Sequence, residues 1–248
     1  MSPWQQQGSL WCLTPPQPRG LVEFIGGSYL AATPQLSYRR LLEALARRGL
    51  AIRAFSYVPG FDHQDQANGA WRAFRRARES RPLGPGSGAT GQEGKPLRLG
   101  HSLGCKLHLL APDNGRGSSA LVALSFNNFS AERSIPLLAE LAPRLGFNSE
   151  FSPSPAETLR LAAASYRQPS NLLIRFRSDP LDQGPSLLAA LQERRGDRSQ
   201  LLELPGDHLT PASAGLRQNV LGAWADDPKR SQQLEQLADQ ISSWAGRP

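Results

Sequence analysis

The stretch Leu97-Arg98-Leu99-Gly100-His101-Ser102-Leu103-Gly104 joins a short apolar run to the pattern Gly-x-Ser-x-Gly. In that pattern the serine occupies a sharp turn between a strand and a helix, which exposes its hydroxyl at the edge of the sheet. Glycines are required because the turn is strained and brings strand and helix together, so a Cβ on either side would clash. The apolar run that begins at Cys105 suits a buried helix. We therefore predict that Ser102 is a nucleophile.

Short β-rich runs alternate with helical stretches on both sides of this turn. Strands are predicted at 21–25, 51–57, 97–100, 121–126, 171–176 and 200–204. Helices are predicted at 36–48, 63–78, 105–110, 186–195 and 229–244. This alternation predicts an α/β fold, a mostly parallel sheet with helices on both faces. The length of 248 residues fits a single domain over 1–248.

Two segments depart from the alternation. About 40 residues separate the strands at 121–126 and 171–176, whereas a crossover needs roughly a dozen or a few more. Helical patterns at 135–145 and 155–167 fit into this interval, so we predict a small helical cap over 127–170. Residues 82–96 are rich in Gly, Pro and Ser, which predicts a flexible surface loop.

A serine nucleophile needs a base that takes its proton and an acid that orients the base. Asp179 and His208 follow the last two predicted strands, in the order nucleophile, acid, histidine that Gly-x-Ser-x-Gly hydrolases use. We predict a catalytic triad of Ser102, Asp179 and His208. Asp182 lies in the same loop and is the alternative acid. Asp207 adjoins His208 in sequence, and neighbouring side chains rarely face each other.

The developing oxyanion requires two backbone N–H donors. We expect one from Leu103, directly after the nucleophile, and one from Ser28, in the turn after the first predicted strand. We expect Gly27, Tyr29 and His101 to contribute to the substrate site. The remaining histidines, at 63 and 108, are interpreted as a helix-start or loop residue and as a core residue.

The formal net charge is +7, and 25 of the 28 basic residues are arginines. The arginines are scattered and do not interleave with aromatic residues, so we expect no nucleic-acid partner. The densest group, between Arg72 and Arg78, is interpreted as a solvated helix face.

Two cysteines imply no disulfide framework, and no signal segment or apolar run of about 20 residues is present. We therefore expect a cytoplasmic protein without a transmembrane segment. The histidines and cysteines lack metal-ligand spacing, and no dinucleotide motif follows a strand, so no metal or cofactor is expected.

Three of these features, the turn at 100–104, the Gly26-Gly27 turn and the terminal Asp-His-Leu-Thr-Pro at 207–211, resemble the α/β-hydrolase superfamily. More narrowly, 100–105, 124–129 and 179–183 resemble an uncharacterised hydrolase-like family, a domain of unknown function of oxygenic phototrophs and plastids. The resemblance covers about residues 20 to 245. It implies an α/β-hydrolase fold and a Ser-His-Asp triad. One departure is that the common His-Gly before the oxyanion turn is Gly-Gly here.

These observations favour a serine hydrolase that cleaves a carboxylic ester or thioester of a small molecule or lipid through an acyl-enzyme. Apolar residues in the predicted cap would suit an acyl chain, although packing of the cap on the core explains them equally well. A non-catalytic binding or scaffold protein with this fold, and an acyltransferase, are the alternatives.

Overall fold

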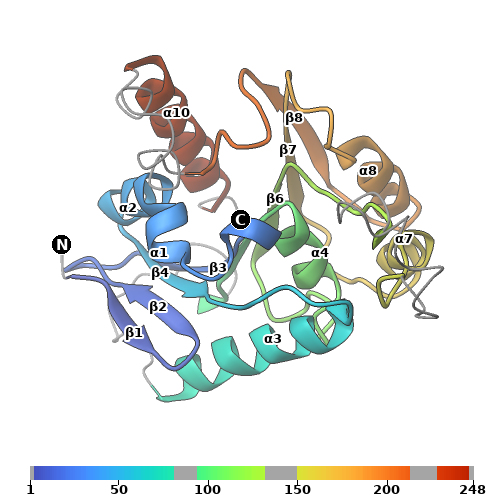
Figure 1. Ribbon diagram of the computed structural model, residues 1–248, viewed down its shortest axis with the longest axis horizontal. Helices are drawn as coiled ribbons and strands as arrows, with labels where there is room; N and C mark the ends of the chain where they lie inside the picture. The colour runs from blue at the N-terminus through green and yellow to red at the C-terminus, as the bar shows by residue number, and fades with distance from the viewer. Residues whose placement is uncertain (1–2, 81–93, 132–149, 213–227, 246–248) are drawn as a thin grey trace, which may run out of the picture.

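The computed structural model describes residues 3–80, 94–131, 150–212 and 228–245 (Figure 1). Within these ranges eight strands form one sheet in the order β1-β2-β4-β3-β5-β6-β7-β8. Their bounds are β1 Gln5–Gln7, β2 Leu10–Leu13, β3 Gly20–Ile25, β4 Leu50–Phe55, β5 Leu97–His101, β6 Ala120–Leu124, β7 Asn171–Phe176 and β8 Gln200–Leu204. The strands from β4 to β8 in the sheet are parallel, and β1 and β2 add an antiparallel edge. The predicted α/β class is confirmed.

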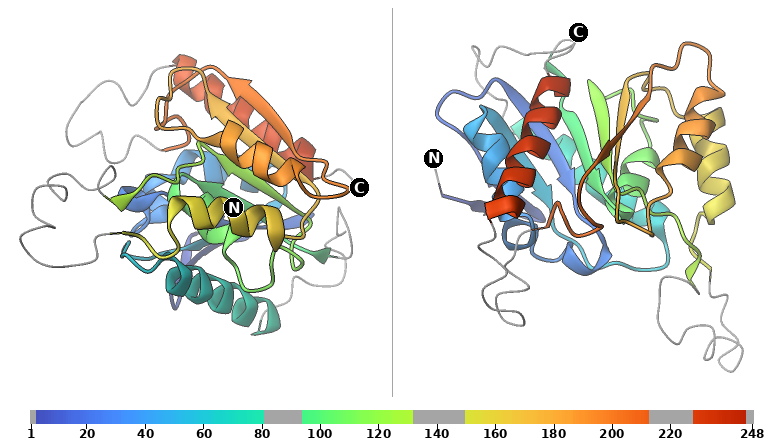
Figure 2. Two further views of the ribbon diagram at one scale, coloured as in Figure 1. Left: turned by 90° about the vertical axis from the view of Figure 1, so that its right-hand side faces the viewer. Right: turned by 90° about the horizontal axis from the view of Figure 1, so that it is seen from above.

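Helices cover both faces of the sheet, as the right-hand view of Figure 2 shows for α10 on one side and α7 with α8 on the other. The helical segments are η1 Ser28–Leu30, α1 Pro34–Ser37, α2 Arg39–Arg47, α3 His63–Ser80, α4 Leu103–Leu109, α7 Pro155–Ala164, α8 Gly184–Gln192 and α10 Pro228–Ala245. One face carries α2 and α10, and the other carries α3, α4, α7 and α8. In the described ranges, none of the helices combines the length and apolarity that a membrane crossing needs.

The alternating side chains of the central strands divide the core into two faces. Val22 and Phe24 of β3 pack with α2 and α10, whereas Ile25 packs with α3 and α4. Glu23 also points to the second face and is only 1% exposed. The Arg78 guanidinium at the end of α3 pairs with its carboxylate. Arg78 therefore does not belong to a solvated face, because its charge offsets that of a buried glutamate.

The structure differs from the predicted elements in three places. The sequence analysis did not predict the β1–β2 hairpin, which turns at Gly8 with φ of +59°. A glycine-serine pair between strands is a hairpin signal. The predicted helix at 36–48 is two helices, α1 and α2, separated at Tyr38, whose φ of −122° is not helical. Helix α7, assigned to the cap, packs against α8 on the sheet face.

Two predictions concern segments outside the described residues. Residues 132–149 are not described, so a cap formed by this part of the predicted interval 127–170 stays a prediction. The same holds for residues 82–93 of the predicted Gly/Pro-rich loop.

Candidate active site

Ser102 lies where β5 ends and α4 begins, at the carboxyl edge of the parallel strands. Its φ of +54° and ψ of −121° place a non-glycine residue in a region that L-residues rarely adopt. The Ser102 amide donates to the Leu124 carbonyl at 2.9 Å, and the Cys105 amide donates to the Ser102 carbonyl at 3.1 Å. These bonds tie the strained turn to the neighbouring strand and to the first turn of the helix.

The two glycines of the turn occupy positions where a side chain has no room. A Cβ on Gly100 would lie 2.6 Å from the backbone N and Cα of Cys105. A Cβ on Gly104 would overlap the carbonyl oxygen of Ile25, the last residue of β3. Gly104 therefore lets α4 approach the turn that follows β3, so that this turn and the serine meet.

The side chains of Ser102, His208 and Asp179 come from three separate connections and lie next to one another in this order. Nε2 of His208 lies 3.2 Å from Oγ of Ser102, and Nδ1 of His208 lies 2.9 Å from Oδ2 of Asp179. The Asp179 carboxylate is fully buried, whereas the side chain of His208 keeps 17% of its surface exposed. The imidazole thus contacts the serine on one side and a carboxylate on the other, and part of it faces solvent.

Among the acidic residues that the structure describes, Asp179 contacts the ring of His208, whereas Asp182 and Asp207 bond to backbone amides. Asp182 Oδ2 accepts from the Gly184 amide at 3.0 Å, and burial raises the pKa of this carboxyl. Asp207 Oδ1 accepts from the Leu209 amide at 2.9 Å and so shapes the loop that carries His208. Burial alone would raise the pKa of Asp179, but hydrogen bonding to His208 brings it below its ordinary value.

The turn after β3 lies directly beside the serine. A Cβ on Gly27 would lie 3.0 Å from Cβ of Ser102, so the absence of a side chain at 27 leaves space next to the hydroxyl. The Gly27 amide donates to Oη of Tyr38 at 2.8 Å, so it is not available to an oxyanion. Ser28 follows it and Leu103 follows the serine, and their amides remain the predicted donors. Tyr29 is 79% exposed.

His101 was predicted to contribute to the substrate site, and the structure corrects this. His101 is 1% exposed, and both of its ring nitrogens contact protein atoms. Nδ1 lies 2.7 Å from Oη of Tyr38, and Nε2 lies 2.8 Å from the carbonyl oxygen of His208. The reason is the alternation along β5, which turns this side chain into the molecule. Tyr38, which the sequence analysis did not single out, lies next to it. The sequence showed only a tyrosine within the predicted helix 36–48, which does not indicate a contact with the site.

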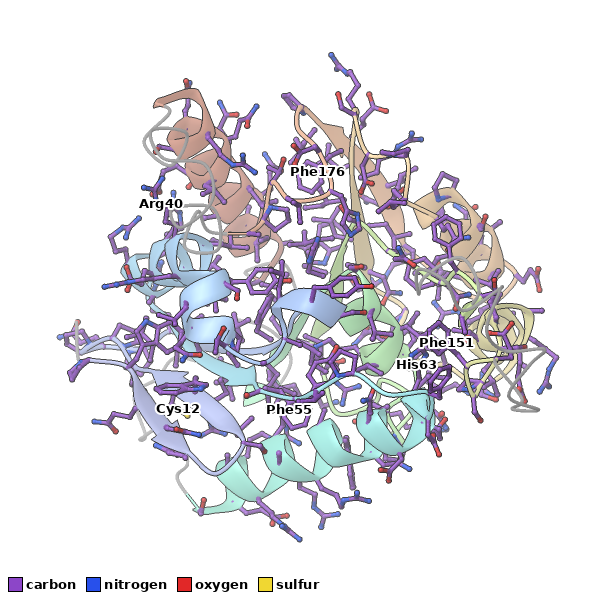
Figure 3. The ribbon with its side chains drawn as sticks, viewed as in Figure 1. Cys12, Arg40, Phe55, His63, Phe151 and Phe176 are labelled. Carbon is purple, nitrogen blue, oxygen red and sulfur yellow. The ribbon has the colours of Figure 1, made fainter. Side chains whose placement is uncertain are left out.

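The other two histidines lie away from Ser102. His108 is buried in α4, with Nε2 3.2 Å from the Leu99 carbonyl oxygen, as predicted for a core residue. His63 begins α3, and its ring packs against that of Phe151 with the centroids 4.2 Å apart and the planes tilted by 30°; Figure 3 labels the two residues next to each other. In the described part of the chain, no three side chains of His, Cys, Asp and Glu gather in a way that could hold a metal ion.

Comparisons with known proteins agree with this geometry at the level of the fold. The model of a family described as "Protein of unknown function (DUF1350)" matches residues 3–244. A search of curated proteins gives no match. Many solved structures are similar, and the three that follow represent them.

The monoacylglycerol lipase of Paleococcus ferrophilus has a TM-score of 0.60 at 15% identity, over 95% of this chain and 98% of that one. The fluorophosphonate-binding serine hydrolase FphF of Staphylococcus aureus has a TM-score of 0.58 at 16% identity, over 100% and 98%. An α/β serine hydrolase without a lid from Xanthomonas campestris has a TM-score of 0.55 at 14% identity, over 95% and 86%. These likenesses identify the fold as that of the α/β hydrolases.

Proposed function

The chain belongs to the DUF1350 family, and we propose that it is a serine hydrolase that cleaves a carboxylic ester or thioester. One observation carries the proposal: His208 lies within hydrogen-bond distance of both Oγ of Ser102 and the buried carboxylate of Asp179. A hydroxyl, a base and an acid in this arrangement are the parts that nucleophilic acyl transfer needs. Solved serine hydrolases, esterases and a lipase share the fold.

The reaction follows from the donors and acceptors of these groups. Oγ of Ser102 attacks the acyl carbon while Nε2 of His208 takes the hydroxyl proton. Asp179 accepts a hydrogen bond from Nδ1 and stabilises the imidazolium that forms. His208 then gives its proton to the leaving alcohol or thiol, and an acyl-Ser102 ester remains. Water attacks this ester in the same way, releases the carboxylic acid and restores the serine.

The oxyanion of each tetrahedral intermediate would accept from the amides of Leu103 and Ser28. Both belong to turns that the structure holds close to the nucleophile, since Gly104 packs against the end of β3 and Gly27 against Ser102. Fixed backbone donors of this kind contribute about 2.7–4 kcal/mol each to transition-state stabilisation.

The surroundings favour a substrate with an apolar acyl part, such as a lipid ester. The described part of the chain exposes five large apolar side chains. All of them lie on the connections that follow β3, β4 and β7, at the same edge of the sheet as Ser102. They are Tyr29, Leu36, Val58, Phe61 and Leu181. Exposed apolar residues gathered at one edge are typical of a surface that binds apolar ligands.

A fluorophosphonate probe tests the nucleophile directly, because it phosphonylates an activated serine. We expect labelling of the wild-type protein and none of Ser102→Ala. Ser56→Ala is a matched control, since its hydroxyl only donates to the Ala32 carbonyl at 2.6 Å, in another loop at the same edge. Equal labelling of Ser102→Ala and the wild type would refute the mechanism.

Turnover is then measured with p-nitrophenyl esters of increasing acyl length, with and without glycerol. Release of free acid supports hydrolysis, whereas acylated glycerol supports an acyltransferase. No turnover or labelling, together with a stable co-purifying partner, would favour a binding protein.

A further inference from the structure

Three hydrogen bonds in series, two of them buried and one partly buried, connect the Gly27 amide, Tyr38, His101 and the His208 carbonyl beside Ser102. The Gly27 amide lies 2.8 Å from Oη of Tyr38, this oxygen lies 2.7 Å from Nδ1 of His101, and Nε2 of His101 lies 2.8 Å from the carbonyl oxygen of His208. Tyr38 is 0% exposed and His101 is 1% exposed, so water does not compete for the bond between these two side chains. The rings of Tyr38 and His101 also meet edge to face.

The chemistry of its two ends gives the chain a single direction. A carbonyl oxygen only accepts, so Nε2 of His101 must carry the hydrogen. Burial lowers the pKa of His101 to about 3, which keeps the ring neutral, and its Nδ1 is then an acceptor. The Tyr38 hydroxyl therefore donates to Nδ1, and its oxygen is free to accept from the Gly27 amide. Each donor has one acceptor along the whole chain.

The chain connects parts of the site that otherwise belong to separate loops. Gly27 precedes Ser28, the predicted oxyanion donor, and His101 precedes the nucleophile. At the other end lies the backbone of His208, in the connection between β8 and α10. Asp179 holds the ring of His208 through Nδ1, but it does not hold the backbone of that residue. The carbonyl bond from His101 does.

We propose that Tyr38 is a positioning residue whose hydroxyl joins the Gly27 amide to Nδ1 of His101 and thereby holds the His208 backbone and the Gly26-Gly27 turn in place around Ser102. The positioning role rests on the proposed hydrolase function, whereas the direction of the chain does not. A phenylalanine at position 38 keeps the buried ring and removes the link. Nδ1 of His101 then loses its donor, while Nε2–H still bonds to the His208 carbonyl, so the ring is no longer tied to the Gly26-Gly27 turn.

The tautomer is read by NMR on protein labelled with ¹⁵N-histidine, which has four histidines. The variants His63→Gln and His108→Gln identify the signals of the two histidines that lie outside both the proposed triad and the series of hydrogen bonds. We expect a neutral His101 with hydrogen on Nε2 in the wild type and in Tyr38→Phe, because the His208 carbonyl requires that hydrogen, and a shifted Nδ1 signal in Tyr38→Phe, because this nitrogen loses its donor. Hydrogen on Nδ1 of wild-type His101 would overturn the proposed direction, whether or not the protein is an enzyme.

The positioning role is tested by the kinetics of p-nitrophenyl butyrate hydrolysis. We expect Tyr38→Phe to lower kcat about 10- to 100-fold with little change in KM, as small displacements of catalytic groups do. Tyr57→Phe is the matched control, because this buried hydroxyl donates to the Gly26 carbonyl at 3.0 Å in the same turn. It should keep kcat within about threefold, the size of ordinary uncoupled effects.

A double substitution separates positioning from packing. In a His101→Ala background the link between Tyr38 and the His208 carbonyl is already broken, so Tyr38→Phe should there cost less than about threefold. Equal losses in both backgrounds, or equal losses for Tyr38→Phe and Tyr57→Phe, would overturn the positioning role alone. A wild-type protein that is neither labelled by fluorophosphonate nor active would overturn the proposed function and this role with it.

Discussion

Nδ1 of His208 lies 2.9 Å from Oδ2 of Asp179, although 29 positions separate the two residues in the sequence. The distance follows from strand pairing, because β7 and β8 are parallel neighbours and Phe176 pairs with Leu204 at their ends. The loops that begin after these two residues therefore leave the sheet at the same edge. Hydrogen bonding to His208 lowers the pKa of Asp179 even though burial opposes it.

The first prediction separates the two candidate acids. Asp179→Asn should lower kcat about 10⁴-fold, because an amide cannot stabilise the imidazolium and favours the wrong tautomer of the base. Asp182→Asn should keep kcat within about threefold, since an amide oxygen can still accept from the Gly184 amide. Kinetics of p-nitrophenyl ester hydrolysis measure both variants. The reverse order of losses would make Asp182 the acid.

The second prediction compares one substitution in two helices. Gly104→Ala should destabilise the protein by about 1–3 kcal/mol or more, because the new Cβ overlaps the Ile25 carbonyl. Gly69→Ala, in the middle of α3, should stabilise it by about 0.5–1 kcal/mol, because its Cβ would meet nothing within 4 Å. Urea unfolding measures both values. Equal effects would show that the close approach of α4 to β3 is not what requires glycine.

The third prediction concerns stability in acid. Burial lowers the pKa of His63, His101 and His108 from 6.5 to about 3 in each case. The folded state keeps these rings neutral, whereas the unfolded chain takes up protons below pH 6.5. The stability that the neutral rings contribute to the folded state is therefore complete above pH 6.5 and is lost as the pH falls toward 3. Within that window each ring lowers the free energy of unfolding by about 1.4 kcal/mol for each unit by which the pH falls.

Urea unfolding at a series of pH values tests this expectation. The free energy of unfolding should fall steeply with acidification, and His108→Gln should reduce the slope by the share of one histidine. A slope that His108→Gln leaves unchanged would contradict the assignment of this ring to the neutral form.

The fourth prediction compares a buried ion pair with an exposed one. Arg98 Nη2 lies 2.7 Å from Oδ2 of Asp113, and the Arg98 side chain is only 2% exposed. Asp113→Asn should cost about 3–5 kcal/mol, because the buried Arg98 loses the carboxylate that it binds through two hydrogen bonds. The exposed pair Arg75–Glu79 is the control, and Glu79→Gln should cost less than about 1 kcal/mol. Thermal and urea unfolding compare them, and equal losses would argue against a desolvated Arg98.

Much of the fold and part of the site could be predicted before any coordinates. The parallel strands and most helices follow from side-chain periodicity, which depends only on nearby residues. The β1–β2 hairpin was missed because its strands are short, and the break at Tyr38 was missed because a helical pattern continues through it. In the site, the loops of Asp179 and His208 were found because both follow strands of a sheet whose carboxyl ends share an edge.

The strained turn that carries Ser102 between its two glycines could be predicted from the sequence itself, because backbone strain and the lack of room for a Cβ depend mainly on residues close in sequence. Only the tertiary structure decided that Asp179, and not Asp182, contacts the ring of His208 and that the side chain of His101 points inward. Tyr38 and His101 are 63 positions apart. Local patterns carry no information about which of such distant side chains meet, since that depends on how strands pair and how closely α4 approaches β3.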